Sequence, residues 1–386
     1  MTTLLSAKRL RGDILFELLS DTIKRLPWPL LAVAALVLCA SVACVHSASW
    51  ISATGTYAHY GKRQIQWIII GVAAFTFVQL LPWRAILFLA PAGWVGGVTS
   101  LCLVFVFGTV VNGSRRWFSF GSIRVQPSEF MKLALVLMLA RVIANSGEEI
   151  QKLRGWVLPG LLAGIPFLLV LKQPDLGTAL TFVPVVVVMI FMAGARVAHM
   201  AGAATLGLLS LVPVWNFVLH DYQKGRILSF LNPEEAARGG AYQQLMSIVG
   251  IGSGGVLGRG YEQGTQGRLG FCPERHTDFI FSVVGEEFGL VGGLLLLLAY
   301  VVMIGLMIRV AVKCHDRSGQ LVAMGVATVF AMQVVVNVAM NTGCGPITGL
   351  TLPLMSYGGS SMISTFLGLG LVARAARLKP GVFDRP

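Results

Sequence analysis

The densest cluster of ionisable side chains in this sequence is the run from Glu274 to Asp278, which leads directly into a long apolar stretch. Asp278 stands at the boundary between the two. A carboxylate at such a boundary is partly desolvated, which raises its pKa and makes it a better base for taking a proton from an alcohol. An aspartate here also suits the cap of the following helix, with His276 as an ordinary interfacial side chain. The residues alone leave both interpretations open.

A second candidate site follows the motif Gln126-Pro127-Ser128-Glu129. Pro127 suits the first turn of a helix, where its missing N–H is not needed. Glu129 and Lys132 are three residues apart and therefore share one face of that helix. An isolated charge in an apolar span costs several kcal/mol unless it is paired or hydrated. The pair is either a structural ion pair or the polar lining of a substrate cavity, and the cavity is the favoured interpretation.

Two further segments carry polar residues between apolar stretches. Asp175, in the turn that begins at Gln173, either caps the next helix or binds a ligand or metal. The segment from Leu352 to Ser361 is rich in small and hydroxylated residues, and close helix packing is a sufficient reason for its glycines. The alternative is that Ser356 and Tyr357 face a polar cavity.

The stretch from Gly250 to Gly255 matches the dinucleotide pattern G-x-G-x-x-G. No strand precedes it and no βαβ unit surrounds it, so this interpretation is rejected. We interpret the glycines from 250 to 260 as giving conformational freedom to a flexible loop.

The elements that position these residues are membrane spans. Only 12% of the 386 residues are charged and 55% are hydrophobic, whereas a soluble domain carries about 25% charged residues. The sequence therefore predicts an all-α integral membrane protein in one bundle. Ten apolar runs are long enough to cross a bilayer: 28–48, 64–81, 84–108, 126–144, 156–172, 176–194, 197–218, 279–311, 319–342 and 351–374. Whether 173–177 is a tight turn or a break in a re-entrant segment stays open.

Charge placement predicts the orientation. With the N-terminus inside, the inner segments hold 17 Lys and Arg, the short outer loops six, and the long loop another six, so both termini are expected in the cytoplasm. The expected divisions are a cytoplasmic tail, a ten-helix membrane domain with a long extracytoplasmic loop between helices 7 and 8, and a second cytoplasmic tail: 1–26, 27–376 with the loop at 219–278, and 377–386. Apolar residues at 226–231 and 241–249 predict two short interfacial helices in that loop.

Some classes of function and site are excluded or disfavoured. The net charge of +13 comes from basic residues scattered between apolar runs, which excludes a nucleic-acid partner. The six cysteines include no CxxC and no Cys/His pair at zinc-ligand spacing. We expect buried or inert thiols, although Cys272 and Cys344 both fall on the predicted outer side, where a disulfide is one alternative.

Several ordered motifs across nearly the whole chain resemble those of the SEDS family, to which RodA, FtsW and SpoVE belong. They are Arg116-Trp117, Gln126 to Glu129, Gln173 to Thr178, Pro273 to Phe281, Gly285-Glu286-Glu287, and Pro353 to Ser361. Gln263 to Gln266 followed by Pro-Glu-Arg-His-Thr-Asp is similar to the elongation members, RodA, rather than to the division members.

The resemblance implies a peptidoglycan glycosyltransferase of the bacterial cytoplasmic (inner) membrane, with its active site on the extracytoplasmic side. Such an enzyme polymerises lipid II, an undecaprenyl-linked disaccharide pentapeptide, with inversion at the anomeric carbon and release of undecaprenyl pyrophosphate. Implied partners are a class B penicillin-binding protein and other membrane proteins of the elongation complex. Alternative functions are a lipid II flippase and the division paralogue with the same chemistry.

The resemblance makes Asp278 the catalytic carboxylate. The remaining candidates would line a cavity that binds the substrate: Arg115, Arg116, Trp117, Glu129, Lys132, Asp175, Arg275, His276 and Ser356. Charge developing on the pyrophosphate leaving group needs either cationic side chains or a divalent ion, and Mg²⁺ or Mn²⁺ would suit oxygen ligands. The sequence does not choose between these two alternatives, and it names no metal ligands.

Overall fold

The structure is a computed structural model that describes residues 24–51, 54–111, 114–121, 123–218, 224–225, 242–269, 271–272 and 274–378. The short helix predicted at 226–231 lies outside these residues. The helix predicted at 241–249 is present as α10 (Tyr242–Ser253), which is followed by the short α11 (Thr265–Arg268).

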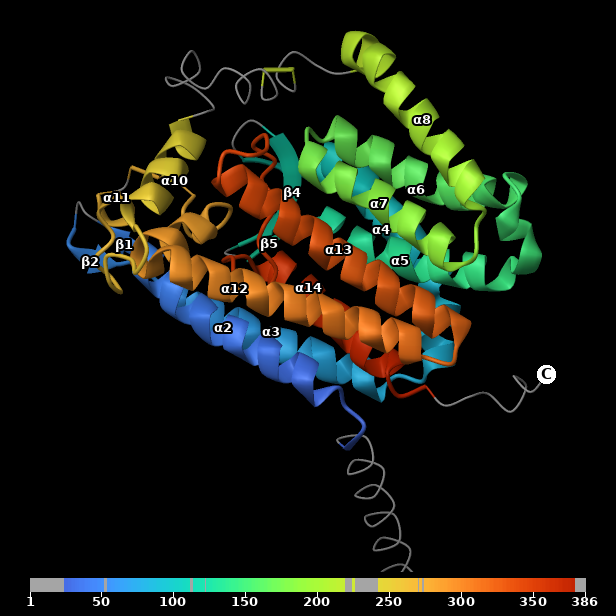
Figure 1. The fold of residues 1–386 in the computed structure, drawn as a ribbon, viewed down its shortest axis with the longest axis horizontal. Coiled ribbons are helices and arrows are strands. Elements are labelled where there is room, and N and C mark those ends of the chain that lie inside the picture. The colour runs from blue at the N-terminus through green and yellow to red at the C-terminus, as the bar shows by residue number, and fades with distance from the viewer. Residues whose placement is uncertain are drawn as a thin grey trace, which may run out of the picture.

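Ten long helices form a single bundle, which confirms the predicted all-α membrane fold (Figure 1). Within the described ranges they are α2 (Trp28–Ala48), α3 (Tyr60–Leu80), α4 (Trp83–Phe107), α5 (Pro127–Asn145), α6 (Arg154–Lys172), α7 (Leu176–Met192), α8 (Val197–Pro213), α12 (Ile280–Lys313), α13 (Arg317–Asn341) and α14 (Gly359–Ala375). A 3₁₀ turn (Gly147–Gln151) precedes α6, and a π turn (Val214–Val218) follows α8.

Seven of these helices are long and apolar enough to cross a membrane by length and composition, among the residues that the structure describes. The other three are α5, α7 and α14. Both α7 and α14 are 17 residues long, and α5 carries the polar residues predicted for a site. α13 packs against α12, α7, α5 and α14, so α5 and α14 lie near the centre of the bundle. Polar side chains on these helices therefore face protein.

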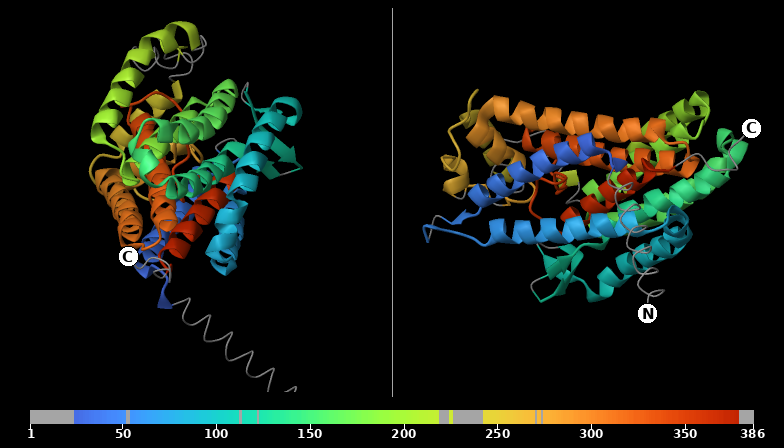
Figure 2. Two further views of the ribbon diagram at one scale, coloured as in Figure 1. Left: turned by 90° about the vertical axis from the view of Figure 1, so that its right-hand side faces the viewer. Right: turned by 90° about the horizontal axis from the view of Figure 1, so that it is seen from below.

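The two ends of the bundle differ in character. Figure 2 shows α10, α11 and the β1–β2 hairpin gathered at one end, while the start of α2 and the end of α14 lie at the other. The hairpin pairs β1 (Trp50–Ile51) with β2 (Thr56–Tyr57). A second small antiparallel sheet joins α4 to α5 in the order β3 (Thr109–Val111), β4 (Ser114–Phe120) and β5 (Ile123–Val125). The sequence prediction contained neither sheet.

The segment 173–175 is a tight turn between two separate helices, which resolves the alternative left open by the sequence. α6 ends at Lys172 and α7 begins at Leu176, and the two helices pack against each other. Asp175 occupies the N-cap position of α7 and accepts a hydrogen bond from the Thr178 N–H at 3.2 Å. The cap and the proline together end one helix and start the next.

The last predicted span was too long at its start. α14 begins at Gly359, not near residue 351, and the chain from 343 to 358 is irregular but mostly buried. Gly349 has φ +74° and Pro353 has no N–H, so neither supports a helix. The Tyr300 hydroxyl donates to the Pro353 carbonyl at 2.7 Å, which satisfies one of the buried backbone groups of this segment.

Close packing explains a glycine at the start of α14, as predicted. A Cβ added at Gly359 would lie 2.7 Å from the ring of Trp67 on α3. The neighbouring hydroxyls are also used, because Ser360 accepts a hydrogen bond from the Gln126 N–H at 3.0 Å and Ser361 bonds with Thr351 at 2.7 Å. These contacts tie α14 to α3 and to the start of α5.

Candidate active site

Asp278 lies half-buried at the end of the long loop, immediately before α12. The N-cap position of α12 is Phe279, whose side chain makes no capping hydrogen bond, so Asp278 does not occupy the capping position. The side-chain amides of Asn337 and Asn341, one turn apart on α13, both donate to the Asp278 carbonyl, at 2.8 and 3.0 Å. The backbone of the candidate base is therefore anchored to α13, a helix most of whose residues are buried.

The carboxylate of Asp278 lies against the irregular segment that precedes α14. A Cβ added at Gly349 would come within 3.4 Å of Asp278 Oδ2. In the same segment, Thr348 would lie 2.8 Å from a Cβ added at Gly177, in the first turn of α7. The short stretch from Thr348 to Leu350 is therefore close both to Asp278 and to the start of α7, which follows Asp175.

Asp175 and Arg116 form a polar cluster around the α6–α7 turn. Arg116 Nη1 lies 3.8 Å from Asp175 Oδ1, its Nε donates to the Gln173 carbonyl at 2.9 Å, and its Nη2 donates to the Pro174 carbonyl. Asp175 Oδ2 accepts from Gln126 Nε2 at 3.1 Å. Charge-assisted bonds of this kind fix the turn strongly. The prediction that Asp175 caps α7 is confirmed. The guanidinium of Arg116 is bound to the carbonyls of the same turn.

His276 belongs to an aromatic group that joins the loop to α3. Its ring stacks on Tyr60 with centroids 4.3 Å apart and an interplanar angle of 14°, and it lies 5.6 Å from the ring of Tyr357. The Tyr357 N–H also donates to the His276 carbonyl at 2.9 Å. Burial lowers the pKa of the His276 imidazole, with Glu274 opposing this shift. A neutral ring in a stack fixes the conformation of the loop just before Asp278.

Glu129 and Lys132 form the predicted ion pair on one face of α5. Lys132 Nζ lies 2.8 Å from Glu129 Oε1, and the side chains of Lys132 and Glu129 are only 2% and 5% exposed. The hydroxyl of Ser364 on α14 donates to Glu129 Oε2 at 3.0 Å. Both charges are therefore fully compensated within the protein, as a buried pair requires.

Arg115 and Trp117 lie on β4, on either side of Arg116. Arg115 is exposed, and its Nη1 donates to the Phe105 carbonyl at 3.1 Å. Trp117 is half-buried, and its strand position pairs with Thr109. The two neighbouring arginines therefore have different partners. Arg115 bonds to the end of α4, whereas Arg116 bonds to the α6–α7 turn.

Arg275 and Ser356 use their polar atoms inside the fold. Arg275 donates to the carbonyls of Ala48 at 2.8 Å and Trp50 at 2.5 Å, and burial lowers the pKa of its guanidinium. The hydroxyl of Ser356, which is 3% exposed, accepts from the Leu352 N–H at 2.8 Å. Arg275 thereby ties the loop that ends at Asp278 to the end of α2, and the Ser356 hydroxyl closes a turn.

Sequence reasoning missed the residues that anchor Asp278. Asn337 and Asn341 stand four residues apart in an apolar span, a spacing that places both amides on one helix face. Polar residues inside a span are expensive and therefore informative, so this signal was available. Tyr60 and Gly349 carried no comparable signal, because nothing in the sequence places them near the loop.

The glycine-rich stretch is not a flexible loop, which corrects the sequence interpretation. α12 is broken at Gly289, whose φ of 66° and ψ of −162° are not helical. Four backbone hydrogen bonds of 2.9 to 3.1 Å join the loop to this break: Arg259 N–H to Glu286 O, Gly260 N–H to Glu287 O, Leu290 N–H to Gly255 O, and Val291 N–H to Val256 O. The glycines permit the close approach of two backbones, which satisfies the peptide groups freed by the break.

Replacing Gly289 with alanine is expected to lower the free energy of unfolding by about 1–3 kcal/mol, because the new Cβ would meet the Gly258 backbone at a conformation disfavoured for L-residues. Thermal or denaturant unfolding of the purified protein in detergent measures this change. The matched control is Gly305→Ala on the same helix, where an added Cβ meets nothing within 4 Å. Equal stability of the two variants would contradict close backbone packing at the Gly289 break in α12.

The described part of the chain contains no group of three or more His, Cys, Asp or Glu side chains placed to hold a metal ion. All six cysteines are free thiols, so the alternative of a Cys272–Cys344 disulfide is not realised. Cys272 is buried, and burial raises the pKa of its thiol to about 12, which makes it inert as expected.

The chain is similar to a set of known proteins along nearly its full length. The family model described as "Cell cycle protein", which covers FtsW, RodA and SpoVE, matches residues 27–380. Stage V sporulation protein E of Bacillus subtilis strain 168 is 38% identical over 330 residues, 82% of this chain and 87% of that protein. Peptidoglycan glycosyltransferase MrdB of Escherichia coli K12 is 37% identical over 322 residues, 83% of this chain and 86% of that protein.

The fold is shared as well. A chain in a solved peptidoglycan synthase complex, described as coordinating polymerization and crosslinking, has 33% identity and a TM-score of 0.78, over 91% of this chain and 97% of that one. The match of the family model to most of the sequence and the relatives above 30% identity agree with the motifs and with the ten-helix bundle. The chain therefore belongs to the SEDS family of multi-pass membrane proteins, with FtsW, RodA and SpoVE.

Proposed function

We propose that this protein is a peptidoglycan glycosyltransferase that polymerises lipid II at the outer face of the bacterial cytoplasmic membrane. The observation that carries the proposal is the placement of Asp278, a half-buried carboxylate whose backbone is fixed by Asn337 and Asn341. The name of the MrdB relative supports the reaction. The positive-inside distribution of Lys and Arg supports the orientation, with the Asp278 end outside.

In this reaction the 4-hydroxyl oxygen of an acceptor sugar attacks the anomeric carbon of a donor. The bond from that carbon to the diphosphate oxygen breaks, its electron pair stays on the diphosphate, and the configuration inverts. Asp278 accepts the hydroxyl proton as general base. The anchored loop, with Arg275 bound to the end of α2 and His276 stacked on Tyr60, holds the carboxylate in place.

The leaving diphosphate needs positive charge, and the predicted cationic residues are mostly engaged. Lys132 pairs with Glu129, Arg116 with the Asp175 turn, and Arg275 with backbone carbonyls. A divalent ion bound near the leaving diphosphate would supply the charge, since Mg²⁺ binds through one or two carboxylates plus substrate phosphates.

Chelation is expected to lower polymerisation at least tenfold, and added Mg²⁺ or Mn²⁺ is expected to restore it, because the diphosphate would lose its counter-charge. The measurement is the initial rate of lipid II polymerisation with excess chelator and after back-titration with each ion. Added K⁺ at equal ionic strength is the control. Full activity in excess chelator would eliminate the metal.

The proposed function is tested by incubating purified protein with lipid II, alone and with a class B penicillin-binding protein. Glycan strands should form and release undecaprenyl pyrophosphate. A flippase would instead move labelled lipid II across vesicle bilayers without forming polymer, and that outcome would overturn the proposal. The partner is proposed because a similar chain is part of a peptidoglycan synthase complex.

We further propose that the protein serves cell elongation. Gln263 to Gln266 and the Pro273 to Asp278 motif support this role, whereas identities of 38% to a sporulation protein and 37% to MrdB do not separate the branches. Expression in cells depleted of their own elongation polymerase should restore rod shape. Rescue only of cells depleted of their division polymerase would assign the chain to the other branch.

A further inference from the structure

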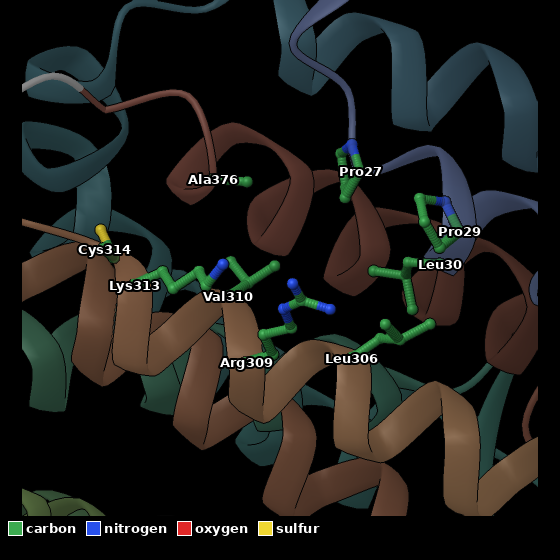
Figure 3. A pocket seen from close by; sticks show the side chains of 9 residues that line it. All are labelled: Pro27, Pro29, Leu30, Leu306, Arg309, Val310, Lys313, Cys314 and Ala376. Carbon is green, nitrogen blue, oxygen red and sulfur yellow. The ribbon is translucent and has the colours of Figure 1, made fainter.

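A pocket lies at the opposite end of the bundle from Asp278. It has a volume of about 270 Å³ and opens between the start of α2, the last turns of α12 and the end of α14. Pro27 and Leu30 form one wall, Leu306 and Val310 the other, and Arg309 and Lys313 extend into the space between them (Figure 3). Both termini are predicted to be cytoplasmic, which places the pocket at the cytoplasmic leaflet.

The two cations lie on one face of α12, and none of the described residues that line the pocket carries a negative charge. Arg309 and Lys313 are four residues apart and both are exposed. In the described residues neither side chain makes a hydrogen bond or an ion pair, and no acidic residue lines the pocket. Two adjacent like charges repel each other, and an anion bound between them would offset this repulsion.

The walls of the pocket identify the kind of anion. Leu30 is buried and Leu306 is partly buried, whereas Val301 and Val312 on the same helix are each 67% exposed on a surface that faces lipid. A ligand here meets an apolar wall on its membrane side and two cations on its aqueous side. That combination matches the phosphate and proximal acyl chain of a phospholipid better than a soluble anion.

We propose that this pocket binds an anionic phospholipid of the cytoplasmic leaflet, with its phosphate between Arg309 and Lys313 and an acyl chain against Leu30 and Leu306. The site is separate from the polymerisation site and does not depend on the proposed function. Basic pockets between transmembrane helices on the cytoplasmic side bind such headgroups through the same chemistry.

The experiment is native mass spectrometry of the purified full-length protein in detergent, titrated with phosphatidylglycerol or phosphatidylcholine. Phosphatidylglycerol should form a saturable one-to-one adduct, and phosphatidylcholine should not. The double variant R309Q/K313Q should bind phosphatidylglycerol roughly 10- to 30-fold more weakly, as the loss of two cationic contacts predicts. Arg309→Lys keeps the charge and should retain most of the affinity.

The matched control is K152Q/R196Q, which removes the same charge from two exposed residues at the same end of the bundle. It should bind as the unmodified protein does. Equal weakening by both double variants would indicate general surface attraction and overturn the site. Competition by inorganic phosphate at lipid-equivalent concentrations would assign a soluble anion instead of a lipid. Absence of any adduct at saturating phosphatidylglycerol would also overturn the proposal.

Discussion

Asp278→Asn is expected to lower the rate of lipid II polymerisation by about 10²- to 10⁴-fold, the range typical of a lost general base. Asparagine has the size and shape of aspartate but does not accept a proton at neutral pH. The two amides from α13 bind the backbone carbonyl of residue 278, which the substitution leaves in place. The fold should therefore survive, and the loss should appear in the chemical step.

The measurement is the initial rate of polymer formation from purified lipid II, with unfolding midpoints recorded for each variant. Glu274→Gln is the matched control, because Glu274 is a half-buried carboxylate of the same loop that accepts a hydrogen bond from the Thr277 hydroxyl at 3.1 Å. It should retain activity within a few-fold. Unchanged polymer from a folded Asp278→Asn protein would remove Asp278 from the mechanism.

The membrane fold was predictable because hydropathy reports directly which segments can lie in lipid. The predicted start of the last span, residue 351, was wrong because it relied on hydropathy alone. Leu352 and Leu354 are as apolar as leucines that face lipid, but they belong to an irregular buried segment before α14. Hydropathy does not tell burial in lipid from burial in protein.

The sequence predicted local contacts among the candidate site residues, but it did not predict the contacts between residues far apart in the chain. Short-range pairs such as Glu129 with Lys132 and Asp175 with Thr178 follow from helix periodicity and capping. Tyr60 stacked on His276 joins residues more than 200 positions apart, and no local pattern encodes that distance. The prediction of a flexible loop from Gly250 to Gly260 was wrong for a related reason. Glycine permits both mobility and close backbone packing, and the sequence does not show which of the two applies.

The Glu129–Lys132 ion pair on α5 is not explained by its contribution to the stability of the fold. A buried pair contributes little stability relative to well-packed apolar residues of similar size, because desolvation offsets the attraction. Glu129 and Lys132 lie in a span where ionisable residues are costly and generally functional. They stand one turn below Gln126, which bonds to both Asp175 and Ser360. We propose that this pair contributes to a polar region that binds the substrate.

A double-mutant cycle separates structure from function at this pair. Glu129→Gln leaves the Lys132 ammonium buried without its counter-charge and should lower the free energy of unfolding by roughly 3–5 kcal/mol. Lys132→Met should have a similar effect on the Glu129 carboxylate, tempered by the hydrogen bond from Ser364. The double variant E129Q/K132M leaves no uncompensated charge, so its stability should return to within about 1 kcal/mol of the unmodified protein.

Activity then decides between the two interpretations. If the pair serves the substrate region, the double variant should be stable yet polymerise lipid II at least tenfold more slowly, because neither charge remains to orient the sugars or the diphosphate. Ser364→Ala is the control, since it removes one hydrogen bond to Glu129 and should cost only about 1 kcal/mol with the ion pair intact. A double variant as active as the unmodified protein would make the pair a packing element between α5 and α14. In that case the proposed polar region would be limited to the Arg116–Asp175 cluster and Gln126.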